Sequence, residues 1–199
     1  MSGLSAAYKL YNSGEKDFLI LESRDRIGGR IMPNDGIDFG ATWFQTHHQN
    51  VIDLLEELEF EKFHQFNEGR SVLVYGTMAP EHYFENDPNA PSAYRVAGNS
   101  MAMIRRLAAP FADHIRKSQV VTQIKDGEEL LSVQTDKQIF KAEKVLVTVP
   151  PRIATRIKYT PELPEKVSIA MEKTHTWMSN AIKVGLTFKK PFWRSKNLS

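Results

Sequence analysis

Apolar residues recur at helical spacing in several segments of the chain. This pattern predicts four helices, over residues 3–10, 48–59, 100–111 and 163–173. In the first helix Leu4, Ala7 and Tyr8 fall on one face, and Asn12-Ser13-Gly14 predicts its end.

Short apolar runs predict the strands. Phe18 to Leu21 is typical of a buried strand in a parallel sheet. Residues 119–149 predict a β-meander with turns at Asp126-Gly127 and Thr135-Asp136. Its last strand, Val145 to Val149, is almost wholly apolar, so we expect it to be buried on both faces. A further strand is predicted over residues 178–189.

The remaining segments contain turn signals. Asn34-Asp35-Gly36 predicts a turn between two short extended pieces. Residues 60–98 predict more short extended pieces, but the Pro- and Asn-rich stretch 78–99 predicts a loop. Asn99 or Ser100 is the expected cap of the helix that follows.

The stretch from Glu22 to Arg30 carries the clearest candidate chemistry. An acid at the carboxyl end of a buried strand is where a dinucleotide fold holds a ribose hydroxyl. Gly28-Gly29 lets the main chain approach a ligand closely, and Arg30 supplies a fork of donors for a pyrophosphate. A buried strand followed by a charged turn would fit the strand and Glu22 equally well.

The start of the chain fits the same site. Ser2-Gly3 followed by an Ala-rich helix resembles the tail of G-x-G-x-x-G, and Gly3 precedes Glu22 by 19 residues, close to the expected interval. The helix, second strand and acid of a dinucleotide-binding unit are present, whereas its first strand is not. We therefore expect the chain to be a fragment that begins inside its own nucleotide-binding motif.

Glu22 to Arg30, read as ESRDRIGGR, resembles the E-x-x-x-R-x-G-G-R signature of the flavin amine oxidase superfamily. Asp38 to Trp43 (DFGATW) is similar to the family segment against the isoalloxazine ring. Residues 145–151 resemble its nucleotide-domain return, and residues 182–193 (IKVGLTFKKPFW) its lysine-bearing strand. The chain corresponds to about the first half of a full member.

The resemblance implies a role for each matching residue. Lys183 is the implied catalytic residue, beside flavin N5. The implied FAD-binding residues are Gly3, Glu22, Arg24, Gly28, Gly29, Arg30, Gly40, Ala41, Thr42, Trp43, Val121, Thr148 and Pro150. Plainer interpretations remain open. Lys183 would lie on a solvated sheet face, and residues 40–43 would form a Gly-Ala loop beside a core tryptophan. Val121 would belong to an ordinary hairpin, and Thr148 and Pro150 to an ordinary strand end.

The implied fold is α/β: a partial Rossmann-like FAD-binding domain, with the first strand missing, and part of a mixed-sheet substrate domain. Residues 1–60 and 99–155 are assigned to the FAD-binding domain, and residues 61–98 and 156–199 to the substrate domain. The implied function is FAD-dependent oxidation of a primary or secondary amine by O₂ to an imine or aldehyde and H₂O₂. A non-catalytic FAD-binding remnant, or an oxidoreductase like the desaturases and protoporphyrinogen oxidase, are the alternatives.

Composition narrows the possible partners. A net charge of +2, without a basic patch interleaved with aromatics, argues against a nucleic-acid surface. The chain has no cysteine, and its six histidines have no zinc spacing, so no metal site is expected. No membrane segment or secretory signal is found, and the cytoplasm is the expected location. The family resemblance implies an amine and O₂ as small-molecule partners, and the oligomeric state is not indicated.

Overall fold

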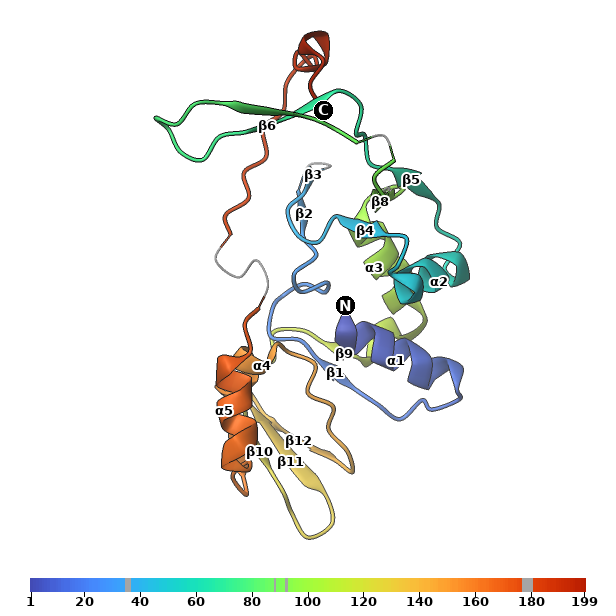
Figure 1. Cartoon of the computed structure of the whole chain (residues 1–199). Coiled ribbons are helices and arrows are strands. Elements are labelled where there is room, and N and C mark those ends of the chain that lie inside the picture. The colour runs from blue at the N-terminus through green and yellow to red at the C-terminus, as the bar shows by residue number, and fades with distance from the viewer. Residues whose placement is uncertain (35–36, 88, 92, 177–180) are drawn as a thin grey trace. The chain divides into compact units, whose positions relative to one another are not determined.

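A computed structural model describes a mixed α/β fold for residues 1–34, 37–87, 89–91, 93–176 and 181–199 (Figure 1). The chain forms two compact units, each built from two stretches of sequence. The first unit contains Met1–Ile31 and Ile104–Lys183, and the second contains Met32–Met103 and Val184–Ser199. Among the described residues, no helix is long and apolar enough to cross a membrane.

The first unit begins with α1 (Ser2–Asn12), which confirms the first predicted helix. Its apolar face buries Leu4, Ala7 and Tyr8, as the spacing predicts. The helix ends before Gly14, whose φ of +95° is a conformation that glycine adopts without steric cost.

Aromatic and aliphatic side chains form the core beside α1. The 3₁₀ helix η1 (Ala109–His114) contacts α1, and the buried Phe111 lies 5.9 Å from Tyr11 and 5.8 Å from Phe18 between ring centroids. Leu107 is 0% exposed, near the end of α3 (Ser100–Ala108). The predicted helix over 100–111 is therefore correct in position, but Pro110 lacks an N–H donor and the chain tightens into 3₁₀ geometry.

Two sheets belong to the first unit. In the smaller sheet, β1 (Ile20–Leu21) pairs in parallel with β9 (Ile115–Arg116). The larger sheet confirms the predicted meander, with the order β12-β11-β10-β13. Its strands are β10 (Val121–Lys125), β11 (Leu131–Thr135), β12 (Ile139–Ala142) and β13 (Lys158–Thr160).

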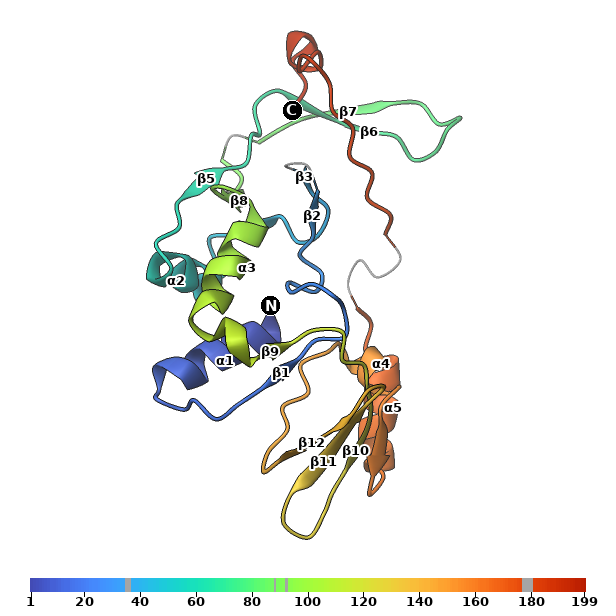
Figure 2. The same ribbon diagram turned by 180° about the vertical axis from the view of Figure 1, so that it is seen from behind.

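Two short helices complete this unit. They are α4 (Pro151–Ala154) and α5 (Glu165–Lys173), and α5 confirms the helix predicted over 163–173. α4 contacts α5, and both views show α5 alongside the larger sheet (Figures 1 and 2). The parallel pairing of β13 with β10 was not predicted, since Lys158 to Thr160 has no apolar run.

The described residues of the second unit form three small sheets. The first pairs β2 (Pro33–Asn34) with β3 (Ile37–Asp38) on either side of residues 35–36, so the predicted turn at Asn34-Asp35-Gly36 falls mainly outside the described residues. The second has the order β4-β8-β5, and the third pairs β6 with β7. Their strands are β4 (Trp43–Gln45), β5 (Lys62–His64), β6 (Arg70–Leu73), β7 (His82–Glu85) and β8 (Ala93–Val96).

Helix α2 (Gln49–Glu57) confirms the prediction over 48–59 and buries Leu55. The loop predicted over residues 78–99 is wrong, because β7 and β8 lie inside it. β8 pairs with β4 and β5, which lie far from it in the sequence, and β7 pairs with the preceding strand β6 in a hairpin. A local count of proline and asparagine does not detect either pairing.

Two further strand predictions are wrong, and a third holds only in part. Residues 145–149 form no strand, and Leu146 is 70% exposed. Residues 181–189 form none either, and Ile182 is 91% exposed; residues 178–180 of that prediction lie outside the described part. Phe18 to Leu21 is a strand only at Ile20–Leu21 and is half-buried. Apolar sequence shows what a segment can bury, whereas a strand also needs a neighbour to pair with.

The end of the chain closes the second unit at an edge of β6. The amide of Arg70 donates to the carbonyl of Asn197 (2.8 Å), and the amide of Ser199 donates to the carbonyl of Arg70 (2.9 Å). The guanidinium of Arg194, in η2 (Arg194–Lys196), lies 3.2 Å from the centroid of the Phe66 ring. Gly69, at φ +88°, makes this approach possible, since a Cβ there would lie 2.5 Å from the Asn197 carbonyl oxygen.

We expect Leu107→Ala to lower the free energy of unfolding by about 2–5 kcal/mol, because it leaves a cavity in a fully buried site. The matched Leu146→Ala is expected to cost less than about 0.5 kcal/mol, since that side chain is already exposed. Urea denaturation measures both. An equal loss for the two variants would show that residues 145–149 are buried in solution.

We expect Gly69→Ala to cost about 1–3 kcal/mol, because alanine is strained at positive φ and its Cβ would meet the Asn197 carbonyl. Faster hydrogen exchange at the amides of Arg70 and Ser199 is the specific readout. Gly76→Ala is the control, since a Cβ at that position would have no atom within 4 Å. Unchanged exchange in Gly69→Ala would contradict the described closure.

Candidate functional site

Glu22 stands at the carboxyl end of β1, as predicted, and the parallel ladder continues through its backbone. Its amide donates to the Arg116 carbonyl, and its carbonyl accepts from the Gln119 amide, both at 2.9 Å. Its Oε1 accepts from the backbone amide of Arg24 (2.9 Å) and the hydroxyl of Ser23 (3.4 Å). These contacts fix the carboxylate at the strand end, where a ribose hydroxyl is held in dinucleotide folds.

The next turn is shaped by Arg26. Its guanidinium donates to the carbonyls of Ile27 (3.3 Å), Gly29 (3.0 Å) and Ile31 (3.2 Å). Gly28 and Gly29 have φ of +100° and +60°, which explains why both positions are glycine. The amide of Ile31 donates to the Gly28 carbonyl at 3.1 Å, so the turn is closed by its own backbone as well as by Arg26.

The two predicted arginines on either side of this turn, Arg24 and Arg30, are exposed. Arg24 contacts Glu22 through its backbone amide. Sequence reasoning missed Arg26 as a positioning residue, although it lies inside the quoted signature. The signal was its place between an acid and two glycines, but only the folded turn shows which arginine points inward.

The start of α1 lies close to these groups. Burial lowers the pKa of the Met1 amino group, while the Glu22 carboxylate raises it and the Arg30 guanidinium lowers it. Gly3 packs so tightly that a Cβ would lie 2.9 Å from Oγ1 of Thr148. The structure thus brings together four predicted residues, Gly3, Glu22, Arg30 and Thr148, around the first turn of a helix.

Two further predicted residues, Val121 and Pro150, are linked to this group through neighbouring residues. The amide of Ser118 donates to the Arg24 carbonyl at 2.8 Å, which holds the start of β10, and thus Val121, next to the Glu22 segment. Pro150 precedes α4, and its carbonyl accepts from the amides of Ile153 and Ala154. The cofactor roles of both residues stay predictions.

The second unit holds the other predicted cofactor segment, Gly40 to Trp43. Thr42 Oγ1 lies 3.3 Å from the Asp38 carbonyl and 3.0 Å from the Gly40 carbonyl, to which it donates. Ala41 is exposed and Trp43 is 68% exposed. A small residue beside an exposed indole presents a flat apolar surface, and such a surface suits a planar ligand.

Lys183 is exposed and lies in a segment without strand pairing, so the strand predicted around it is not found. Its role beside a flavin stays a prediction.

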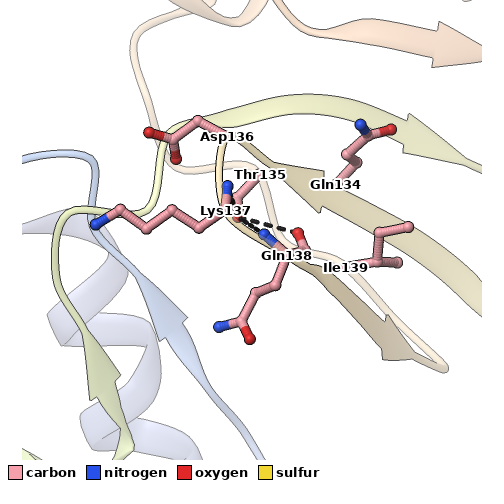
Figure 3. A pocket seen from close by; sticks show the side chains of 6 residues that line it. All are labelled: Gln134, Thr135, Asp136, Lys137, Gln138 and Ile139. Atoms are coloured by element: carbon pink, nitrogen blue, oxygen red, sulfur yellow. Dashed lines mark hydrogen bonds between the residues drawn. The ribbon is translucent and has the colours of Figure 1, made fainter.

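A surface hollow occurs at the turn between β11 and β12, and its lining contains none of the predicted site residues (Figure 3). It is lined only by Gln134 to Ile139. Thr135 Oγ1 accepts from the amides of Lys137 (3.2 Å) and Gln138 (3.1 Å), so the polar atoms there serve the turn itself. This hollow is a feature of the hairpin and offers no convergent chemistry.

We expect Arg26→Gln to destabilise the first unit by about 1–3 kcal/mol, because three carbonyls lose a charged donor. Arg24→Gln is the matched control, since its side chain is exposed, and should change stability by less than about 0.5 kcal/mol. Thermal unfolding of both variants measures the difference. Equal stabilities would show that Arg26 does not hold the turn.

Curated relatives match parts of the chain. A flavin-containing amine oxidase from Danio rerio is 27% identical over 109 residues, covering 54% of this chain and 20% of the relative. Putrescine oxidase from Kocuria rosea is 36% identical over 77 residues, covering 37% of this chain and 16% of the relative. In these alignments the chain therefore covers a fifth or less of the full length of each relative.

Solved structures show the same fold over the whole chain. Two structures of putrescine oxidase, a mutant and the wild type bound to putrescine, match with TM-scores of 0.79 and 0.77. Both are 20% identical and cover 100% of this chain and 66% of theirs. A sequence profile of flavin containing amine oxidoreductases matches residues 1–95 and 74–199. Because these matches together span the chain, the protein belongs to the flavin-containing amine oxidoreductase family.

Proposed function

We propose that this chain forms the Rossmann-like FAD-binding part of an amine oxidase, together with part of its substrate domain. The observation that carries the proposal is the group of Gly3, Glu22, Arg30 and Thr148 in the first unit, with the Glu22 carboxylate fixed at a strand end. The family and the putrescine oxidase fold support it.

The residues present fit this cofactor. Gly3 lets the start of α1 pack directly on Thr148, since a Cβ there would lie 2.9 Å from the Thr148 hydroxyl, and this keeps the first turn of the helix next to the segment before α4. Glu22 would bind the adenosine ribose, and Arg30 and the amides of the Gly28-Gly29 turn would bind the pyrophosphate. Arg24 is exposed and would lie at the adenosine end, next to the backbone of Val121.

The segment Gly40 to Trp43 would line the isoalloxazine, with Ala41 and Trp43 presenting their exposed surfaces. Lys183 would hold a water or proton beside flavin N5. Thr148 and Pro150 would border the cofactor from the segment before α4. These residues would bind the cofactor and orient it, because the redox chemistry belongs to the cofactor itself.

FAD, when bound, would take two electrons and a proton from the carbon next to nitrogen and pass them to O₂. The overall reaction is amine plus O₂ plus water to aldehyde, H₂O₂ and ammonia or a smaller amine. Putrescine is the first substrate to test, given the putrescine oxidase relatives.

A second function is favoured by a specific observation. No strand holds residues 181–189, the segment that contains Lys183. If this segment does not hold Lys183 beside flavin N5, the Glu22 site could still bind FAD, but the chain would not oxidise an amine. The chain spans only part of its relatives, so the activity of a full-length oxidase is proposed and not observed.

We expect the purified chain to retain FAD on gel filtration, with flavin absorbance travelling with the protein. Glu22→Gln should raise the FAD dissociation constant about tenfold, because the ribose loses a charged acceptor. Asp25→Asn is the matched control, since Asp25 is an exposed acid in the same charged loop. Loss of flavin from the wild-type chain would refute the proposal.

Anaerobic mixing of the loaded protein with putrescine and other amines then separates the two functions. Bleaching of the flavin absorbance, slowed in Lys183→Met, would support the oxidase. Retained FAD with no bleaching by any amine would support the non-catalytic module.

A further inference from the structure

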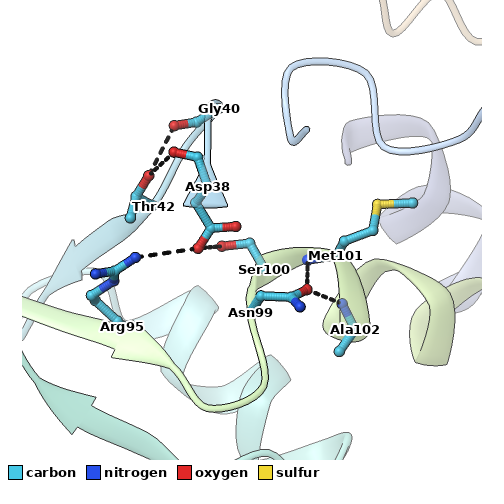
Figure 4. A network of polar contacts seen from close by, with 8 residues as sticks. All are labelled: Asp38, Gly40, Thr42, Arg95, Asn99, Ser100, Met101 and Ala102. Atoms are coloured by element: carbon cyan, nitrogen blue, oxygen red, sulfur yellow. Dashed lines mark hydrogen bonds and ion pairs between the residues drawn. The ribbon is translucent and has the colours of Figure 1, made fainter. Parts of the chain in front are cut away.

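Asp38 carries a buried carboxylate that the proposed function does not use. It is 8% exposed and lies at the end of β3 (Figure 4). Its Oδ2 lies 3.6 Å from Nη2 of Arg95 in β8 and accepts from the hydroxyl of Ser100, the first residue of α3, at 3.5 Å. The side chain therefore joins three elements of the second unit.

Burial of a carboxylate is costly unless a partner compensates its charge. Arg95 supplies the opposite charge, and its side chain is itself only 32% exposed. Ser100 places the start of α3 beside the acid, where the helix dipole favours a negative charge. The turn at Gly98 and Asn99, both at positive φ, delivers Ser100 to this point, and Asn99 Oδ1 caps the helix by accepting from the amides of Met101 and Ala102 (Figure 4).

Backbone pairing joins β3 to β2. Asp38 is opposite Pro33 in this ladder, and proline has no N–H to donate. The amide of Phe39 donates to the carbonyl of Met32 at 2.8 Å and continues the ladder in the same register. The side-chain cluster of Asp38 adds a link from β3 to β8 and α3, which the pairing of β2 with β3 does not provide.

The same cluster reaches the segment Gly40 to Trp43. The Asp38 carbonyl lies within hydrogen-bonding distance of the Thr42 hydroxyl, so one residue contacts both Arg95 and the turn. Arg95 is directly opposite Trp43 in the antiparallel pair of β8 and β4. Residues opposite each other in such a pair have side chains on the same face of the sheet.

We propose that the Asp38–Arg95 ion pair positions the turn Gly40–Thr42 and the indole of Trp43 as a preformed surface for a planar ligand. Asp38 and Arg95 are positioning residues in this scheme: they act through Thr42 and Trp43 and do not themselves contact the ligand. The identity of that ligand as the isoalloxazine of FAD rests on the proposed function. The pair joins a buried carboxylate to a partly exposed guanidinium, so removing either partner leaves the other charge poorly compensated.

The test compares Asp38→Asn, Arg95→Met and the double variant with wild type in the full chain. Asp53→Asn is the matched control, since Asp53 is an exposed acid on α2 of the same unit. Hydrogen exchange of a peptide covering residues 39–45 reports the order of the segment without any cofactor. FAD titration by flavin fluorescence reports the ligand surface.

We expect exchange over residues 39–45 to speed up about tenfold in Asp38→Asn and in Arg95→Met, with no change at β10, β11 and β12 of the first unit. Because the two side chains act as a pair, the double variant should lose no more than about the larger single loss. The FAD dissociation constant should rise about tenfold in all three variants, while Asp53→Asn matches wild type.

Two results would overturn the inference. The first is unchanged exchange over residues 39–45 in Asp38→Asn. The second is faster exchange with an unchanged FAD dissociation constant in a chain that binds FAD, since the pair would then stabilise the segment without serving the ligand. If the wild-type chain does not bind FAD, the proposed function fails, and the exchange and pair-coupling results alone decide whether the ion pair positions the segment.

Discussion

The parallel pairing of β1 with β9 is the constraint on which the candidate cofactor site depends. It joins residues that are far apart in the sequence, with Ile20 opposite Ile115 and Leu21 opposite Arg116. The hydrogen bonds of the Glu22 backbone extend this pairing beyond the two strands. A two-residue strand has little stability of its own, so the surrounding core of α1 and η1 must hold it in place.

Local patterns were sufficient where neighbouring residues decide the structure. The helices at Leu4 and Leu55 follow from apolar spacing, and the meander follows from turns at Asp126-Gly127 and Thr135-Asp136. The expected strand-end acid is also found at the end of β1. In each case the period of the side chains, or the preference of one turn, carries the information.

Sequence reasoning failed where the outcome depends on a distant partner. β8 exists because β4 and β5 pair with it from far away in the sequence, although its own sequence favours a loop. Val145 to Val149 has the sequence of a central strand but no strand structure. Arg26 and Arg24 have the same chemistry, and only the fold of the turn decides that Arg26 points at three carbonyls. Asp38 and Arg95 are likewise brought together by strand pairing that no local motif encodes.

Two apolar segments that lie outside the sheets affect the solubility of the protein. Residues 145–149 and 181–188 expose Leu146, Val147, Ile182, Val184 and Leu186, and neither segment is paired with a neighbouring strand. Such segments are templates for strand addition by another chain. Solubility during preparation will therefore depend on concentration, and a charged substitution at Ile182 or Leu146 is a direct way to reduce aggregation without touching the buried core.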